Sequence, residues 1–173
     1  MNNWYMLTVI GRDRPGIVAA VTSALYGGGC NLGEASMLRL GGNFTIMLMV
    51  RYPGDARSLE ALLEPVCSGW ELRSHVDPIE GRLHEHVEPD ARISVFGADR
   101  AGIVSRVTSA LVDAGLDILD LESDVIGDEQ NPVYVMHIEG RAKQGIEALQ
   151  GALTGIAEEG IDVHVTPVDT MMG

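Results

Sequence analysis

Apolar residues follow two different spacings along the first half of the chain. Segments with apolar residues at every second position favour strands, and spacings of three or four favour helices. Helical spacing starts at Gly16, Pro15 suits the first turn of that helix, and the glycines from Gly27 end it. The pattern predicts strands at Trp4–Ile10, Asn31–Leu40, Phe44–Val50 and Trp70–Val76, and a second helix over Leu59–Val66.

The second half repeats this order of elements. It predicts strands at Arg92–Phe96, Asp117–Ile126, Val133–Glu139 and Ile161–Thr166, and helices at Gly102–Ala114 and Lys143–Glu158. With right-handed crossovers, the order βαββαβ puts both helices on one face of a four-stranded antiparallel sheet. The predicted fold class is therefore α+β, with two ferredoxin-like sandwiches of this kind.

The repetition extends to the residues themselves. Val9–Leu25 reads VIGRDRPGIVAAVTSAL and Val95–Leu111 reads VFGADRAGIVSRVTSAL, so 12 of 17 positions are identical at an offset of 86 residues. A period near half the chain length indicates two copies of one domain. We expect a first domain at 1–78, a linker at 79–90 and a second domain at 91–173.

The expected linker contains a possible metal-binding pair, His84 and His86. Two histidines on an extended segment can bind one ion, but no neighbouring residues complete a tetrahedral set. We therefore expect a solvated linker and no metal site.

One face of the first predicted sheet lacks a cover. Over Phe44–Val50 the alternation puts Met47 and Met49 on the face opposite the helices. That face, and the edge strand at Asn31–Leu40, need another sheet or subunit to cover them. We therefore expect the protein to form a homo-oligomer.

Charge and cysteine content narrow the possible functions. The net charge is −13, and residues 79–173 carry 18 acidic against 6 basic residues. Such a chain is repelled by phosphate backbones and anionic membranes, so we expect neither direct nucleic-acid binding nor membrane binding. The two cysteines, Cys30 and Cys67, lack metal-ligand spacing and indicate reduced thiols in the cytoplasm.

The sequence contains no convincing catalytic constellation. It lacks Gly-x-Ser-x-Gly and the phosphate-binding Gly-x4-Gly-Lys-Ser/Thr loop. No histidine is tied to Cys30 by spacing, and His137 and His164 lie inside predicted strands. We therefore expect a protein that is not an enzyme and needs no cofactor.

The phrases GRDRPGIVAAVTSALYGGGCNL and GADRAGIVSRVTSALVDAGLDI resemble tandem ACT domains, which are small amino-acid-sensing modules. They are similar to those of the glycine cleavage system transcriptional repressor family. The resemblance implies an amino-acid-sensing regulatory protein that controls transcription through a protein partner, such as a transcriptional activator. Two alternatives stay open: a regulatory subunit of a separate metabolic enzyme, and a purely structural assembly protein.

The resemblance also implies where a ligand binds. Many ACT domains hold a free amino acid near the loop before the first helix, at an interface between two domains. For a small amino acid, glycine or similar, Asp13 would accept the ammonium group and the helix start at Gly16 would receive the carboxylate. Asn31 is expected close by. The candidate ligand-binding residues are Asp13, Pro15, Gly16, Ile17, Asn31 and Leu32 in the first copy, and Asp99, Gly102, Ile103, Asp117 and Ile118 in the second.

A simpler interpretation of these residues stays open. Asp13 and Asp99 would then only cap helices, and Gly16 and Gly102 would only permit close packing. The two copies also differ, because Asp117 stands where the first copy has Asn31 and cannot donate to a carboxylate. We expect the first site to bind an amino acid better than the second.

Overall fold

The computed structural model describes residues 3–80, 87–98, 102–128 and 130–168. The chain divides into two compact units, Met1–His84 and Glu85–Gly173, which are described separately below. The histidine pair of the expected linker lies outside the described residues, and so does the candidate residue Asp99.

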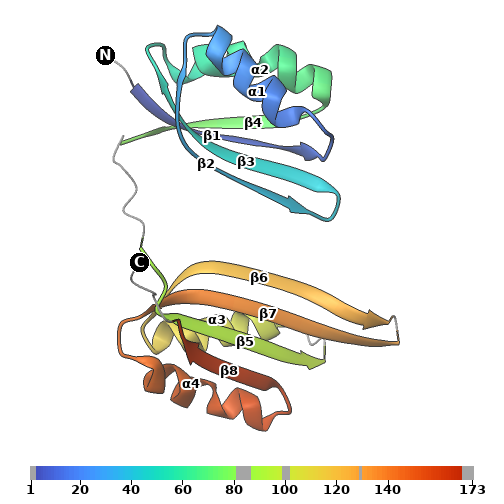
Figure 1. Ribbon diagram of the computed structural model, residues 1–173, viewed down its shortest axis with the longest axis vertical. Helices are drawn as coiled ribbons and strands as arrows, with labels where there is room; N and C mark the ends of the chain where they lie inside the picture. Colours follow the sequence, from blue (N-terminus) through green and yellow to red (C-terminus); the bar gives the residue numbers. More distant parts are fainter. Residues whose placement is uncertain (1–2, 81–86, 99–101, 129, 169–173) are drawn as a thin grey trace. The chain divides into compact units, whose positions relative to one another are not determined.

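Each unit contains the predicted order of elements (Figure 1). The first unit consists of β1 (Asn3–Arg12), α1 (Ile17–Gly27), β2 (Asn31–Leu40), β3 (Asn43–Tyr52), α2 (Ala56–Trp70) and β4 (Arg73–Ile79). The second consists of β5 (Ala91–Ala98), α3 (Ile103–Asp113), β6 (Leu116–Asp128), β7 (Asn131–Ala142), α4 (Ile146–Glu158) and β8 (Asp162–Pro167).

The strand orders are β2-β3-β1-β4 and β6-β7-β5-β8, and all neighbouring strands are antiparallel. Both helices of a unit cover the same face of its sheet (Figure 1). This arrangement confirms the predicted α+β class with two ferredoxin-like sandwiches. It also confirms that the second strand of the first copy, β2, lies at a sheet edge.

The two cores are built from matching positions. In the first unit, Leu7 and Val9 of β1 pack with Ile17, Val21 and Leu25 of α1. In the second unit, the residues 86 positions later play the same part, namely Ile93, Val95, Ile103, Val107 and Leu111. Full burial of each such side chain stabilises a fold by about 1.5–3 kcal/mol. The apolar positions that the repeated phrase buries are therefore the same in both units.

Two predicted boundaries are wrong for local backbone reasons. Trp70 was expected to open a strand, but it ends α2, and β4 begins only at Arg73. Glu71, at φ 56°, adopts the left-handed conformation that terminates the helix. Pro15 lies in the turn before α1 instead of in its first turn, because Gly16 occupies the N-cap position.

Asp55 caps α2, and its removal should weaken the first unit. Its carboxylate accepts hydrogen bonds from the Ser58 N–H (2.8 Å) and the Ser58 hydroxyl (2.5 Å), which lower the pKa of Asp55. A lowered folded-state pKa means that the stabilisation is present above the ordinary aspartate pKa and is lost as the pH falls through the folded value. We expect Asp55→Ala to lower the melting temperature at pH 7.

The control for this variant is Asp77→Ala, which removes an exposed carboxylate from β4. Thermal melts followed by circular dichroism at pH 7 and at about pH 3 make the comparison. The loss caused by Asp55→Ala should shrink at the lower pH. Equal melting of the two variants at pH 7 would show that the cap contributes nothing.

Candidate functional site

A cleft of about 600 Å³ opens in the first unit where β1 ends. It is lined by the loop Asp13–Gly16, the start of α1 at Ile17–Ala19, and Met37, Arg39 and Phe44 of the β2–β3 hairpin. The Asp13 N–H donates to the Gly42 carbonyl oxygen at 3.0 Å, which ties the loop to the hairpin turn. The cleft therefore contains four of the sequence-predicted candidates, Asp13, Pro15, Gly16 and Ile17.

An ion pair crosses this cleft. The Arg39 Nε donates to Asp13 Oδ2 at 2.7 Å, and a terminal guanidinium nitrogen contacts the same oxygen. The Asp13 side chain is only 22% exposed, whereas Arg39 is 67% exposed. Asp13 is therefore held near the floor of the cleft, and its charge is balanced by a side chain that stays accessible to solvent.

Asp13 does not cap α1, so the interpretation of this residue as a cap is wrong. Gly16 is the N-cap residue of α1, and no side chain hydrogen-bonds there. The Gly16 carbonyl accepts the first helical bond from the Ala20 N–H at 2.9 Å. The amide groups of the first helical turn lack intrahelical acceptors, and this end of the helix carries partial positive charge.

The two glycines are required by backbone conformation. Gly16 has φ 96° and Gly102 has φ 82°, both in the left-handed region that glycine adopts readily. A Cβ atom on Gly16 would lie 3.3 Å from Trp70 Cη2, but one on Gly102 would meet no atom of the described residues within 4 Å. Close packing is therefore not the common reason for glycine, and the interpretation that assigned these residues only to packing is wrong for Gly102.

Arg14 points to another part of the first unit. It forms an ion pair with Glu71, the residue that terminates α2. Its charge is therefore balanced by an acidic residue far away in the sequence. The pair connects the loop before α1 with the end of α2.

Asn31 and Leu32 lie at the opposite end of the first sheet. Asn31 is level with Arg51, which pairs with Trp4 near the start of β1, whereas Asp13 follows the end of β1. Nine positions, from Trp4 to Asp13, separate the two levels, or roughly 30 Å. The expectation that Asn31 lies beside the start of α1 is wrong, because α1 carries the chain back along the sheet before β2 begins.

The second unit keeps the left-handed glycine at the helix start but lacks a counterpart of Arg39. Gly102 and Ile103 begin α3, whereas Asp117 and Ile118 lie at the far end of β6, and Asp117 is 3.7 Å from Lys143 Nζ. In the first unit, Arg39 of β2 pairs with Phe44 of β3. The corresponding pair of the second unit is Val125 of β6 with Tyr134 of β7. Valine therefore stands at the place of Arg39, and by the same register serine, Ser123, stands at the place of Met37.

Comparisons with known proteins agree with this duplicated fold. Models of the ACT domain match residues 5–77 and residues 91–153. The chain belongs to the ACT-domain family. It contains two ACT domains in tandem, and the cleft at Asp13 lies in the first of them.

Relatives share this tandem organisation over most of their length. The chain is 27% identical over 139 residues to the glycine cleavage system transcriptional repressors of Escherichia coli (strain K12) and Shigella flexneri, covering 79% of this chain and 73% of each relative. A crystal structure of an unknown protein from Galdieria sulphuraria matches 98% of this chain and all of its own, with a TM-score of 0.77 and 24% identity. A protein provisionally named as a glycine cleavage system transcriptional repressor matches 98% of this chain and 99% of its own, with a TM-score of 0.73 and 16% identity. The structural matches establish the fold.

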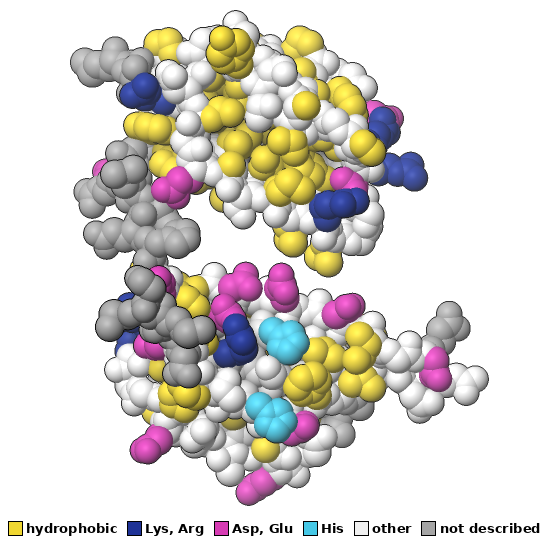
Figure 2. Space-filling view, in the orientation of Figure 1, with side chains coloured by type: hydrophobic (Ala, Val, Ile, Leu, Met, Phe, Trp, Pro, Cys, Tyr) yellow, Lys and Arg dark blue, Asp and Glu magenta, His cyan; other side chains and the backbone are white. Residues whose placement is uncertain are grey.

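The outer faces of the two ACT-domain sheets differ in chemistry. In the first ACT domain, the face away from the helices carries apolar side chains, including Ile10, Leu38 and Met47, which are 39–52% exposed. This confirms the expected outward position of Met47. In Figure 2, hydrophobic side chains are prominent on the first domain, whereas acidic groups and histidines appear on the second.

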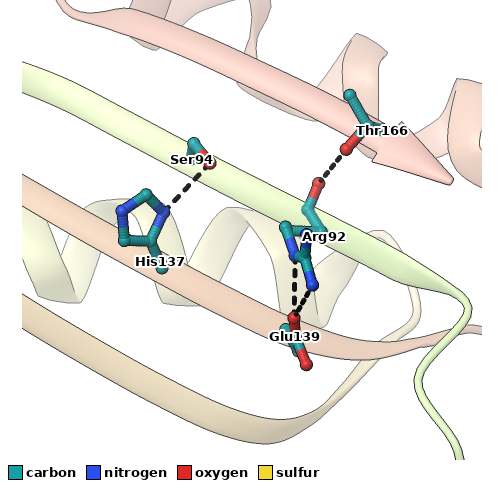
Figure 3. Close-up of polar contacts among 5 residues, drawn as sticks. All are labelled: Arg92, Ser94, His137, Glu139 and Thr166. Carbon is teal, nitrogen blue, oxygen red and sulfur yellow. Dashed lines mark hydrogen bonds and ion pairs between the residues drawn. The ribbon is translucent and has the colours of Figure 1, made fainter. Parts of the chain in front are cut away.

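The second ACT domain has a polar network on the corresponding face (Figure 3). Ser94 Oγ lies 3.0 Å from His137 Nδ1, and the Arg92 Nε donates to Glu139 at 2.7 Å. His137 stands at the register position of Met47, because it pairs with Ser94 as Met47 pairs with Thr8. The two sheets therefore present different surfaces on one scaffold.

Other features of the described chain do not add to the site. A second cleft of about 360 Å³ lies between α4 and β8, away from the start of α3. Cys30 and Cys67 are free and buried, and burial raises the pKa of the Cys30 thiol. Within the described ranges, no group of three or more His, Cys, Asp or Glu residues could hold a metal ion, and no helix is long and apolar enough to span a membrane.

Sequence reasoning missed Met37, Arg39 and Phe44 as residues of the cleft. A signal for them was present in the alternation of β2 and β3 around Gly41 and Gly42, since that turn sets the register. Counting outward from the turn puts Arg39 opposite Phe44, on the face toward the helices. The start of α1 then lies above them.

The backbone requirement at Gly16 gives a direct stability test. Gly16→Ala forces an alanine into the left-handed region and should destabilise the first ACT domain by about 1–2 kcal/mol. The matched control is Gly27→Ala at the end of α1, where a Cβ has open space and helical conformation favours alanine. Urea unfolding measures both, and equal stability of Gly16→Ala and the unmodified protein would contradict the requirement.

Proposed function

We propose that this protein senses a free amino acid in the cleft of its first ACT domain. The observation that carries the proposal is the convergence of Asp13, Arg39 and the start of α1 in one cleft. A carboxylate, a guanidinium and a helix start together offer both charges that a zwitterion needs. The volume of about 600 Å³ lies within the range of about 300–1,000 Å³ found for ligand sites.

In this proposal each residue of the loop has a separate task. Asp13 accepts hydrogen bonds from the ligand ammonium group, and the amides that follow Gly16 face its carboxylate. Pro15 limits the conformations of the loop, and Ile17 supplies apolar contact beneath it. Glycine or a similar small amino acid is the smallest ligand that satisfies both charges.

The remaining candidate residues take other places in the proposal. Asn31 and Leu32 would contact the ligand only where a second copy brings the start of its β2 against this cleft, and the same holds for Asp117 and Ile118 in the second domain. Asp99, Gly102 and Ile103 form the weaker site or a purely structural one, because Val125 replaces the cation.

We further propose that the bound amino acid regulates a protein partner. A ligand that binds one conformation of a protein more tightly than another increases the population of the first conformation. The surface that a protein partner meets then changes with the concentration of the ligand. The relatives are named as transcriptional repressors of the glycine cleavage system, which supports a role in transcription. The net charge of −13 favours action through a protein such as a transcriptional activator, instead of direct contact with DNA. The free, buried thiols fit a cytoplasmic setting.

Calorimetric titration of the full chain with a panel of amino acids tests the ligand proposal. At least one amino acid should bind the unmodified protein, and Asp13→Ala should weaken its binding at least tenfold, since the ammonium group loses its carboxylate. The melting temperature should change little, because exposed ion pairs contribute about 0–1 kcal/mol. The control is Asp77→Ala, and failure of every amino acid to bind the unmodified protein would refute the proposal.

The outer face of the first sheet is the proposed contact with a second copy of the chain. Four strands about 4.8 Å apart and roughly 33 Å long give a face of about 600 Å² per copy. Two such faces bury about 1,200 Å², the lower end of the range for specific interfaces. A two-fold dimer would bury Ile10, Leu38 and Met47 of both copies together.

A charge on this face should dissociate the oligomer. We expect Met47→Glu to shift the protein to a monomer in light scattering coupled to size exclusion, since it would bury an unpaired carboxylate in an apolar interface. The matched control is His137→Glu at the same register position of the second sheet, which should leave the mass unchanged. A monomeric unmodified protein would overturn this part of the proposal.

A further inference from the structure

We infer that Arg39 and Met37 make the cleft selective for an α-amino acid with an apolar side chain. In this inference Arg39 binds the ligand carboxylate, and Met37 with Val18 contacts the ligand side chain. The inference rests on the proposed amino-acid binding and goes beyond it by naming the ligand class and two residues that select it.

Arg39 can bind a second carboxylate while it holds Asp13. A guanidinium has five N–H donors, and its contacts with Asp13 use Nε and one terminal nitrogen. The side chain is 67% exposed, so the remaining donors are accessible from the cleft. A zwitterion whose ammonium group lies against Asp13 can therefore place its carboxylate against Arg39, and every charge in the cleft keeps an opposite partner.

The rest of the lining is apolar and partly exposed. Met37 is 51% exposed and Val18 is 37% exposed, although both are large hydrophobic residues. Phe44 and Ile17 lie buried among the same lining residues, each 2% exposed. Glycine would leave Met37 and Val18 in contact with water, whereas an aliphatic or thioether side chain would cover them. Each CH₂ group buried in this way tightens binding about fourfold.

The second ACT domain supplies an internal comparison. It repeats the left-handed glycine and the helix start, but Val125 and Ser123 stand at the places of Arg39 and Met37. The left-handed glycine and the helix start are therefore common to both domains, whereas only the first domain has arginine and methionine at these two positions of its second strand. Arg39 and Met37, to which the inference assigns selectivity, are among the lining residues that differ between the domains, together with Pro15, Ala19 and Phe44.

The test is calorimetry on the full chain with leucine, methionine, glycine and leucinamide, which lacks the carboxylate. The unmodified protein should bind leucine or methionine at least tenfold more tightly than glycine. It should also prefer leucine to leucinamide. Arg39→Val, which introduces the residue of the second domain, should weaken the binding of leucine at least tenfold and reduce the preference over leucinamide to what the amides after Gly16 contribute.

Two further variants separate the tasks of the residues. Met37→Ser should reduce the preference for leucine over glycine and leave the affinity for glycine nearly unchanged. The matched control, Val125→Ala, should change the affinity for neither ligand. If Arg39 only positions Asp13, Arg39→Val will lower the affinities for leucine and for leucinamide by the same factor. That result would show that Arg39 does not bind the ligand carboxylate.

The outcomes also distinguish this inference from the proposed function. Glycine binding as tightly as leucine, with Met37→Ser without effect, overturns the selectivity and leaves amino-acid sensing intact. Absence of binding by any amino acid to the unmodified protein overturns both. Thermal melts of each variant verify that the first domain remains folded.

Discussion

The left-handed glycine at the start of the first helix of each domain is the constraint on which the site depends. At Gly16 the chain must leave β1 and enter α1 within a few residues, and only a positive φ makes that turn without strain. The turn leaves the first amides of the helix beside the β2–β3 hairpin. It also leaves Asp13 free of a capping role, so its carboxylate is available to Arg39.

Duplication of one scaffold has preserved its core and changed its surfaces. The buried residues of the first strand and first helix recur at an offset of 86, as Val21 and Val107 illustrate, because close-packed interiors tolerate few changes of volume. Exposed register positions differ in chemistry: Arg39 corresponds to Val125, and Met47 to His137. The two domains therefore present different surfaces, and our proposals place ligand binding and self-association on the first.

The fold could be predicted from the sequence because the spacing of apolar residues indicated the same order of strands and helices in both halves of the chain. The apolar residues of α1 and the alternation of β3 predicted both the elements and the covered face of the sheet. The end of α2 could not be predicted, since it depends on Glu71 in a left-handed conformation that residue type does not signal.

For the site, local motifs found the loop at Asp13 but misplaced Asn31, because nearness across a sheet depends on strand direction. Arg39 was missed because its role depends on the register set by the hairpin turn.

The most direct measurement of the central claim is a nuclear magnetic resonance titration of the ¹⁵N-labelled chain with leucine. Amide resonances of Gly16, Ile17 and Val18 should shift with ligand concentration, together with those of Met37 and Arg39. The corresponding resonances at Gly102 and Val125 should move less. Unchanged resonances around Gly16 at millimolar leucine, methionine and glycine, or shifts confined to the second domain, would contradict the account.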